Sequence, residues 1–220
     1  MTQSLPLIYF LIASVLFGIM LWICEKWDPE TNLRCDTFEA ATHGIGLLLI
    51  SFLSFSCWKS ILEQILSLII LTILQFCAHT DYKTKFVYRF FNLILVGVSL
   101  IFFVVQLIMN PIEPMRLFST VATTLIYVLI LIVLHKVKTY GTGDVLSLIG
   151  NALFIVYVLP SDRFFTIEIL LWHYCLAVIL LIVMNFTKFN WKQMKLKEEI
   201  AFLPQIYLST VMLMLYFLYF

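Results

Sequence analysis

Residues 90–109 read FFNLILVGVSLIFFVVQLIM, a run of 20 residues without a single charge. A helix of about 20 mostly apolar residues is long enough to cross the hydrocarbon core of a bilayer. The whole chain continues this pattern, because 62% of its 220 residues are hydrophobic and only 12% are charged. A soluble domain averages roughly 45–50% apolar and about 25% charged residues. The apolar excess is too large for a soluble core, so the sequence predicts a multi-pass membrane protein.

Charged residues and prolines divide the rest of the sequence into further apolar runs. Together the runs predict an all-α, polytopic transmembrane bundle of about eight helices, in a single domain 1–220 with no separate soluble domain. The N-terminus has no basic residue, so we interpret its apolar run as a first membrane helix rather than a secretory signal peptide. The second, third and sixth runs are short, and the second and third could form a hairpin that barely spans the membrane. The predicted helices cover residues 5–24, 40–57, 61–79, 90–109, 117–135, 145–160, 165–186 and 202–220.

The lysines and arginines predict the orientation of the bundle, because cytoplasmic loops are enriched in them. Only Lys59, Arg116 and Arg163 fall on one side, which leaves 11 of the 14 Lys and Arg residues on the other. This split places the connections after the first, third, fifth and seventh helices in the cytosol and both termini outside. The 11 residues are Lys26, Arg34, Lys83, Lys85, Arg89, Lys136, Lys138, Lys188, Lys192, Lys195 and Lys197.

The residue patterns that mark several other functional classes are missing. No basic cluster with interleaved aromatics indicates nucleic-acid binding, and no P-loop, dinucleotide fingerprint or G-x-S-x-G motif occurs. The five cysteines form no C-x-x-C pair, and the histidines His43, His79, His135 and His173 are scattered along the sequence. The sequence therefore predicts no metal site and no cofactor.

Two aspartates at the predicted cytosolic edge are the candidate catalytic residues. Asp144 ends the run Gly141-Thr142-Gly143-Asp144 and begins the sixth predicted helix, and Asp81 follows the third. Taken singly, Asp144 has the ordinary interpretation of a helix N-cap, and Asp81 that of an interfacial loop residue. Two carboxylates held together in a weakly polar site cannot both ionise easily, so they share a proton. One then activates water as a base while the other protonates the scissile carbonyl, as in aspartic proteases.

These motifs resemble those of the type IV prepilin peptidases, a family of GxGD intramembrane aspartic peptidases. Residues 141–145, GTGDV, resemble the GxGD-V motif of that family, and residues 81–87, DYKTKFV, resemble its upstream Asp motif. Residues 200–204, IAFLP, are similar to its late I-P-F-x-P stretch. Leu146 and Tyr88 stand where the family often has Lys and Pro, but neither departure removes a carboxylate.

The resemblance implies an enzyme that removes the short basic leader from prepilin-like proteins, such as competence pseudopilins, at the cytosolic face of a bacterial plasma membrane. It implies Asp81 and Asp144 as the catalytic pair, Gly141 and Gly143 as supporting residues, and prepilin-like substrates and lipid as partners. The short connection 25–39 lacks the two C-x-x-C pairs of larger family members. The chain is in this respect similar to the small leader peptidases of Gram-positive competence systems, and N-methylation of the product is not expected.

Alternatives remain open at this point. Signal peptide peptidases also use GxGD, but their Tyr-Asp motif is missing because Thr80 precedes Asp81. A small proton-coupled membrane transporter or a non-catalytic scaffold belongs to a different class. A transporter would favour acidic residues near the membrane midplane rather than at one edge.

The connection 25–39 is acidic, although the other predicted cytosolic connections are basic or neutral. Its five acidic residues outnumber Lys26 and Arg34, which gives a net charge of −3. This connection is either an ordinary solvated loop or a surface that attracts a basic leader by electrostatic steering. In the second interpretation, Asp28, Glu30 and Asp36 are candidate substrate-binding residues.

Overall fold

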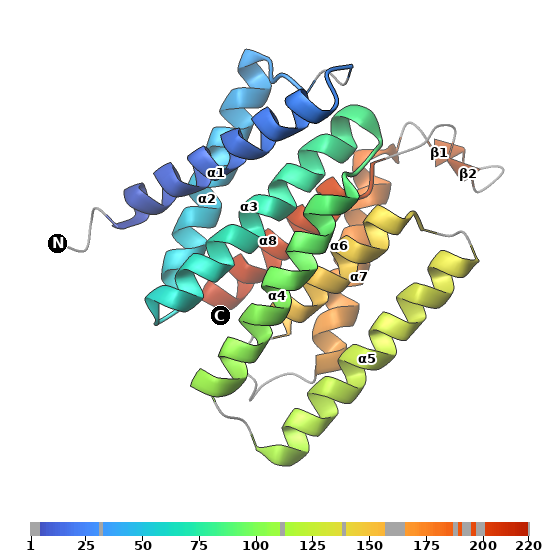
Figure 1. Ribbon diagram of the computed structural model, residues 1–220. Coiled ribbons are helices and arrows are strands. Elements are labelled where there is room, and N and C mark those ends of the chain that lie inside the picture. The colour runs from blue at the N-terminus through green and yellow to red at the C-terminus, as the bar shows by residue number, and fades with distance from the viewer. Residues whose placement is uncertain are drawn as a thin grey trace.

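The computed structural model in Figure 1 is a helical bundle, and the prediction of an all-α fold with about eight helices is confirmed. The structure describes residues 5–30, 33–110, 113–137, 140–156, 166–186, 189–190, 195–196 and 201–219. Its helices are α1 (Leu5–Trp27), α2 (Thr37–Cys57), α3 (Ile61–Thr84), α4 (Arg89–Met109), α5 (Pro114–Lys136), α6 (Thr142–Ile155), α7 (Thr166–Met184) and α8 (Leu203–Tyr219). Two short strands, β1 (Phe189–Asn190) and β2 (Lys195–Leu196), pair antiparallel between α7 and α8.

Six helices, α1 to α5 and α7, are long and apolar enough to cross a membrane, and the chain is a multi-pass membrane protein. The helices α2 and α3 have 21 and 24 residues, so each is long enough to cross a membrane by itself. The helices α6 and α8 are shorter apolar helices of 14 and 17 residues. The second half of the predicted sixth helix, residues 157–160, lies outside the described residues.

Helix α3 is the centre of the bundle. It contacts α1, α2, α4, α6 and α8, whereas α5 lies at one side and contacts α6 and α7 (Figure 1). Within the membrane-length stretch of α3, 72% of the residues are buried, compared with 17–39% in the other long helices. Polar side chains near the end of α3 are therefore held inside the protein rather than in lipid.

The end of α3 lies later than the sequence predicted, and this changes the setting of Asp81. We expected the helix to stop at His79 and Asp81 to lie in a loop, but α3 continues to Thr84. Helix α3 ends where Lys85 adopts a left-handed conformation, with φ of 56°. The Lys85 backbone N–H donates to the Asp81 carbonyl at 2.9 Å. Asp81 therefore lies in the last turns of a helix, which fixes the direction of its side chain.

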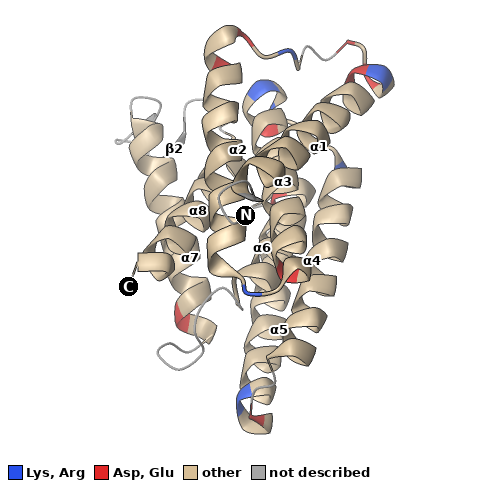
Figure 2. Cartoon of the chain, turned by 90° about the vertical axis from the view of Figure 1, so that its left-hand side faces the viewer, with Lys and Arg blue, Asp and Glu red and all other residues tan. Residues whose placement is uncertain are grey.

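Charged residues gather near the ends of the helices, and the stretches between are almost free of them (Figure 2). We call the end formed by the connections after α1, α3, α5 and α7 the basic end. Its described residues include six of the 11 Lys and Arg residues that the sequence assigns to this side. Lys138, Arg163, Lys188, Lys192 and Lys197, and the side chain of Lys195, lie outside the described residues.

A buried polar cluster ties α6, α7 and α8 together. The His173 ring on α7 lies 2.8 Å from Asn151 on α6 and 2.8 Å from the Ser209 hydroxyl on α8. Asn151 also donates to Thr210 at 2.8 Å. Hydrogen bonds between helices stabilise membrane bundles that apolar packing alone would leave free to slide. The cluster fixes α8 relative to α6, and both helices begin at the basic end.

Candidate functional site

Asp81 is buried at the point where α3 meets the beginning of α8. Its side chain is only 6% exposed, and its Oδ2 atom accepts a hydrogen bond of 2.9 Å from the backbone N–H of Leu203. The backbone of Phe202 also hydrogen-bonds to this carboxylate. The first N–H groups of a helix have no partner within the helix, so a carboxylate there satisfies them. Asp81 thus binds the late stretch that resembles the family motif, 122 residues away in sequence.

Asp144 lies in the first turn of α6, but it is not the N-cap that we expected. The N-cap is Gly141, and Asp144 is the third helical residue. Its Oδ2 atom accepts a hydrogen bond of 3.2 Å from the Gly141 backbone N–H. This is half of a capping box, because glycine has no side chain to return the bond. The Asp144 side chain therefore points back toward the beginning of α6 and is half-buried.

Two stacked aromatic residues lie next to the backbone groups that bind the two aspartates. Tyr140 immediately precedes the glycine that binds Asp144, and Phe202 precedes the residue that binds Asp81. Their rings stack with centroids 5.6 Å apart and an interplanar angle of 19°. The Tyr140 hydroxyl is hydrogen-bonded to Tyr174, and burial raises the pKa of the Tyr140 hydroxyl, so it keeps its proton. The stack places the beginnings of α6 and α8 beside each other.

The two carboxylates that the sequence singled out are therefore brought to one place. Helices α3 and α6 are in contact, and the two carboxyl groups are near enough for their charges to influence each other. Asp81 is the more enclosed of the two, and Asp144 is the more accessible. A pair of carboxyl groups in such a setting can bind one proton between them and act as acid and base.

Gly143 lets α6 approach the beginning of α4 closely. A Cβ atom at this position would lie 3.0 Å from the Val87 Cβ and 3.3 Å from the Asn92 side-chain nitrogen. Asn92 is fully buried, donates to the Gly143 carbonyl at 3.3 Å and accepts from the Ser147 hydroxyl at 2.7 Å. Gly143 and Asn92 together hold the Asp144 turn, and no pattern in the sequence indicated this role of Asn92.

The three candidate residues in the acidic connection have different settings. Asp36 is the N-cap of α2 and accepts from the Glu39 backbone N–H at 2.8 Å, so it has a structural task. Asp28 accepts a hydrogen bond of 3.4 Å from the Tyr88 hydroxyl, and Glu30 is exposed. Tyr88 is itself the N-cap of α4 with φ of −64°, which is the value that the proline common at this motif position would adopt.

One more carboxylate besides Asp81 is buried among the described residues, and the sequence analysis missed it. Glu63 is only 4% exposed and lies at the beginning of α3, at the opposite end of the bundle from Asp81. It accepts hydrogen bonds from Gln106 at 2.7 Å, from Asn110 at 3.1 Å and from the Ser60 backbone at 3.0 Å. These partners satisfy the carboxylate as a helix cap that ties α3 to α4. The capping pattern of Ser60 followed three residues later by Glu63 was visible in the sequence.

The expectation that the histidines are scattered is wrong for His43 and His79. Their rings lie in contact, with His43 Nε2 2.9 Å from His79 Nδ1, and Cys35 lies beside them. The contact joins residues 36 positions apart in the sequence, one on α2 and the other on α3. This grouping removes the reason for which we expected no metal site.

Comparison of the chain with protein-family models, with curated proteins and with solved structures gives no match. The fold and the site define a multi-pass helical membrane protein with a carboxylate pair at one end of the bundle. The likeness to prepilin peptidases rests on the motif residues, of which Ile200 lies outside the described part of the chain.

Proposed function

We propose that this protein is an intramembrane aspartic endopeptidase that removes short basic leaders from prepilin-like proteins. The observation that carries the proposal is that Asp81 and Asp144 lie on contacting helices at the basic end, each bound by a backbone N–H from the beginning of a helix. Both aspartates belong to stretches that resemble prepilin-peptidase motifs. The third such stretch supplies the Leu203 N–H that binds Asp81.

The chemistry needs no group beyond the two carboxyls and a water molecule. The ionised carboxylate takes a proton from water, and the resulting hydroxide attacks the carbonyl carbon of the scissile peptide bond. The other carboxyl gives its proton to the carbonyl oxygen, which produces a tetrahedral gem-diol. The carboxyl that took the proton from water then gives it to the peptide nitrogen, and the C–N bond breaks. A gem-diol hydroxyl returns its proton to the other carboxylate, so Asp81 and Asp144 again hold one proton between them.

A proton-coupled transporter is the alternative from another class, and the position of the carboxylates argues against it. Asp81 lies in the last turns of α3, and Asp144 lies in the first turn of α6. Transporters carry their coupling residues near the bilayer midplane, typically where helices are interrupted. A carboxylate pair at one end of a bundle instead suits a substrate whose cleavage point lies at the membrane surface.

Cleavage is tested by co-expressing the chain with a tagged probe that has a short Lys/Arg-rich leader ahead of an apolar helix. We expect a faster-migrating product on a gel, with a new N-terminus at the junction between leader and helix. The matched control is the same probe expressed without the chain. An uncleaved probe in membranes that contain the folded chain would contradict the proposal.

The proposed orientation places the basic end in the cytosol. We expect a reporter fused after Lys138 to read as cytosolic and one fused after Arg116 to read as external, because 11 of the 14 Lys and Arg residues belong to one side. Alkaline phosphatase and green fluorescent protein fusions at both positions provide the measurement. The opposite result at both positions would move the carboxylate pair to the external face.

The acidic connection is expected to attract the basic leader. Neutralising Asp28 and Glu30 together should raise KM for a basic leader several-fold and leave kcat unchanged, because charge steering acts on association. The effect should fall in high salt, since such attraction is screened over about 8–10 Å at physiological ionic strength. Asp36 is left unchanged in this variant because its capping bond stabilises α2. An equal rise in KM for a leader without Lys or Arg would show that the variant acts through folding.

A further inference from the structure

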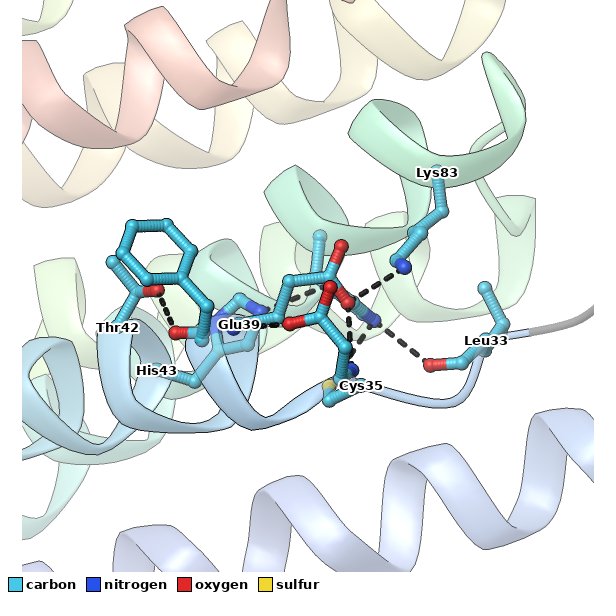
Figure 3. Close-up of polar contacts among 9 residues, drawn as sticks. Leu33, Cys35, Glu39, Thr42, His43 and Lys83 are labelled. Atoms are coloured by element: carbon cyan, nitrogen blue, oxygen red, sulfur yellow. Dashed lines mark hydrogen bonds and ion pairs between the residues drawn. The ribbon is translucent and has the colours of Figure 1, made fainter.

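Three side chains that commonly bind metals meet at the basic end, on the side of α3 that faces α2. Cys35 comes from the connection before α2, His43 from the second turn of α2, and His79 from the last turns of α3. One donor atom from each residue lies within 4.8 Å of the other two. Figure 3 shows Cys35 and His43 in this group, with Glu39 and Lys83 beside them. None of the three ligating residues takes part in the proposed cleavage.

The separations of the donor atoms are close to those that a small tetrahedral metal site requires. His43 Nε2 lies 2.9 Å from His79 Nδ1, the Cys35 thiol lies 3.8 Å from the other nitrogen of the His79 ring, and one donor atom from each of the three residues lies within 4.8 Å of the others. Zn²⁺ binds nitrogen at about 2.0–2.1 Å and thiolate sulfur at about 2.3 Å, which separates tetrahedral donors by roughly 3.3–3.7 Å. To admit the ion, the two imidazole nitrogens have to separate by about half an ångström and the thiol has to approach them.

We propose that Cys35, His43 and His79 form a binding site for a divalent transition metal, for which Zn²⁺ is the best match. A thiolate with two imidazoles is a donor set that Zn²⁺ favours, and Mg²⁺ and Ca²⁺ favour oxygen donors instead. Three protein ligands leave a fourth position for water or another group. The donors come from two helices and the connection before the second, so sequence spacing alone could not reveal the set.

The surroundings of His79 already have the form of a second coordination shell. The His79 Nε2 atom lies 3.1 Å from the carbonyl oxygen of Leu33, which is fully buried. A ring N–H that donates to a backbone carbonyl leaves the other nitrogen unprotonated and able to bind a metal, as is usual for histidine ligands. Leu33 and Cys35 belong to the same connection, so one segment supplies both a ligand and the anchor of another ligand.

Gln75 on α3 holds His43 next to His79. The Gln75 side-chain nitrogen lies 3.4 Å from His43 Nδ1, so without metal a neutral chain of donors runs from Gln75 through His43 and His79 to Leu33. The same Gln75 nitrogen donates to the His43 backbone carbonyl at 3.2 Å, and the Tyr207 hydroxyl donates to the Gln75 oxygen at 3.4 Å. Gln75 therefore keeps both of these hydrogen bonds when a metal at His43 Nε2 replaces the bond between the two rings.

The site is partly buried, with an aromatic ring over the two histidines and an ion pair beside it. The Phe17 ring lies 5.2 Å from the His43 ring and 6.1 Å from the His79 ring, which covers the pair from α1. Glu39 interacts electrostatically with all three proposed ligands and forms an ion pair of 2.6 Å with Lys83. A bound metal would tie the connection before α2 to the last turns of α3, and it would stabilise the folded chain by mass action.

The test measures metal bound to the purified full chain in detergent. After incubation with Zn²⁺ and removal of the excess, we expect about one Zn²⁺ per wild-type chain, as for a single specific site. Cys35→Ser and His43→Gln should each lose this metal. The matched controls Cys175→Ser and His135→Gln change the same residue types outside the cluster and should keep it.

A second measurement uses only the wild-type chain, so its result does not depend on whether a variant folds. The wild-type chain loaded with Co²⁺ should show the absorption of a thiolate-to-metal charge transfer. Its absence, or a Zn²⁺ content of Cys35→Ser and His43→Gln equal to that of the controls, would overturn the site. Asp81→Asn should bind Zn²⁺ like the wild type, so failure of the metal site and failure of the proposed peptidase are distinguished.

Discussion

Asn in place of either Asp81 or Asp144 is expected to abolish leader cleavage. General acid–base groups typically contribute about 10²- to 10⁴-fold to a rate, and an amide can neither take nor give the shared proton. We therefore expect a loss of at least about 100-fold in cleavage rate for each single variant and no further loss when both are combined, since residues that act as one unit are not additive. The measurement is the initial rate of cleavage of the leader probe.

The two variants should keep the fold, which makes the loss interpretable. The side-chain oxygen of Asn at position 81 can still accept from the Leu203 N–H, and that of Asn at position 144 can accept from Gly141. Glu113→Gln is the control, because it removes an exposed carboxylate at the beginning of α5, at the other end of the bundle. It should cleave at the wild-type rate. A single Asp variant that keeps more than about a tenth of this rate would remove that residue from the mechanism.

The helical architecture could be predicted because its causes are local. Lipid imposes a minimum length of apolar residues, and the punctuation of the runs by charges gave the number of helices. The ends of helices were harder to predict, since they depend on tertiary partners. His79, Thr80 and Asp81 look like the start of a polar loop, but all three belong to α3. His43 and Leu33 satisfy the His79 ring, and the beginning of α8 satisfies Asp81. The Thr80 hydroxyl donates within α3, to the Cys77 carbonyl.

The sequence pointed to Asp81 and Asp144 as candidates, but it did not predict the hydrogen bonds that hold their side chains. GTGD marks a turn and an acid in the sequence, and the structure shows that Asp144 bonds back to Gly141 rather than capping the helix. The contact of Asp81 with Leu203 joins residues 122 positions apart, and no local pattern encodes it. The contact between His43 and His79 was not predicted for the same reason. Contacts between helices that cross in space leave no periodic trace in one sequence.

The close approach of α4 and α6 is a further tertiary feature, and it depends on Gly150. A Cβ atom at this position would lie 3.0 Å from Leu95 Cγ and 3.3 Å from the backbone nitrogen of Val96. Small residues let helix backbones meet closely in membrane proteins, where packing and hydrogen bonds replace the hydrophobic effect. Gly97, by contrast, is exposed on α4, and nothing lies within 4 Å of the corresponding Cβ position.

Gly150→Leu is therefore expected to separate α4 from α6, whereas Gly97→Leu is not. Overpacking typically costs about 1–3 kcal/mol, and we expect the upper end of this range because the obstacle is partly backbone that cannot rotate away. Gly97→Leu should be neutral or slightly stabilising, since Gly is a poorer helix former than Leu. The free energy of unfolding in detergent micelles gives the comparison. Gly150→Leu should also slow leader cleavage, because the displaced α6 carries Asp144 away from Asp81. Equal stability of the two variants would mean that the helices have room to adjust at Gly150.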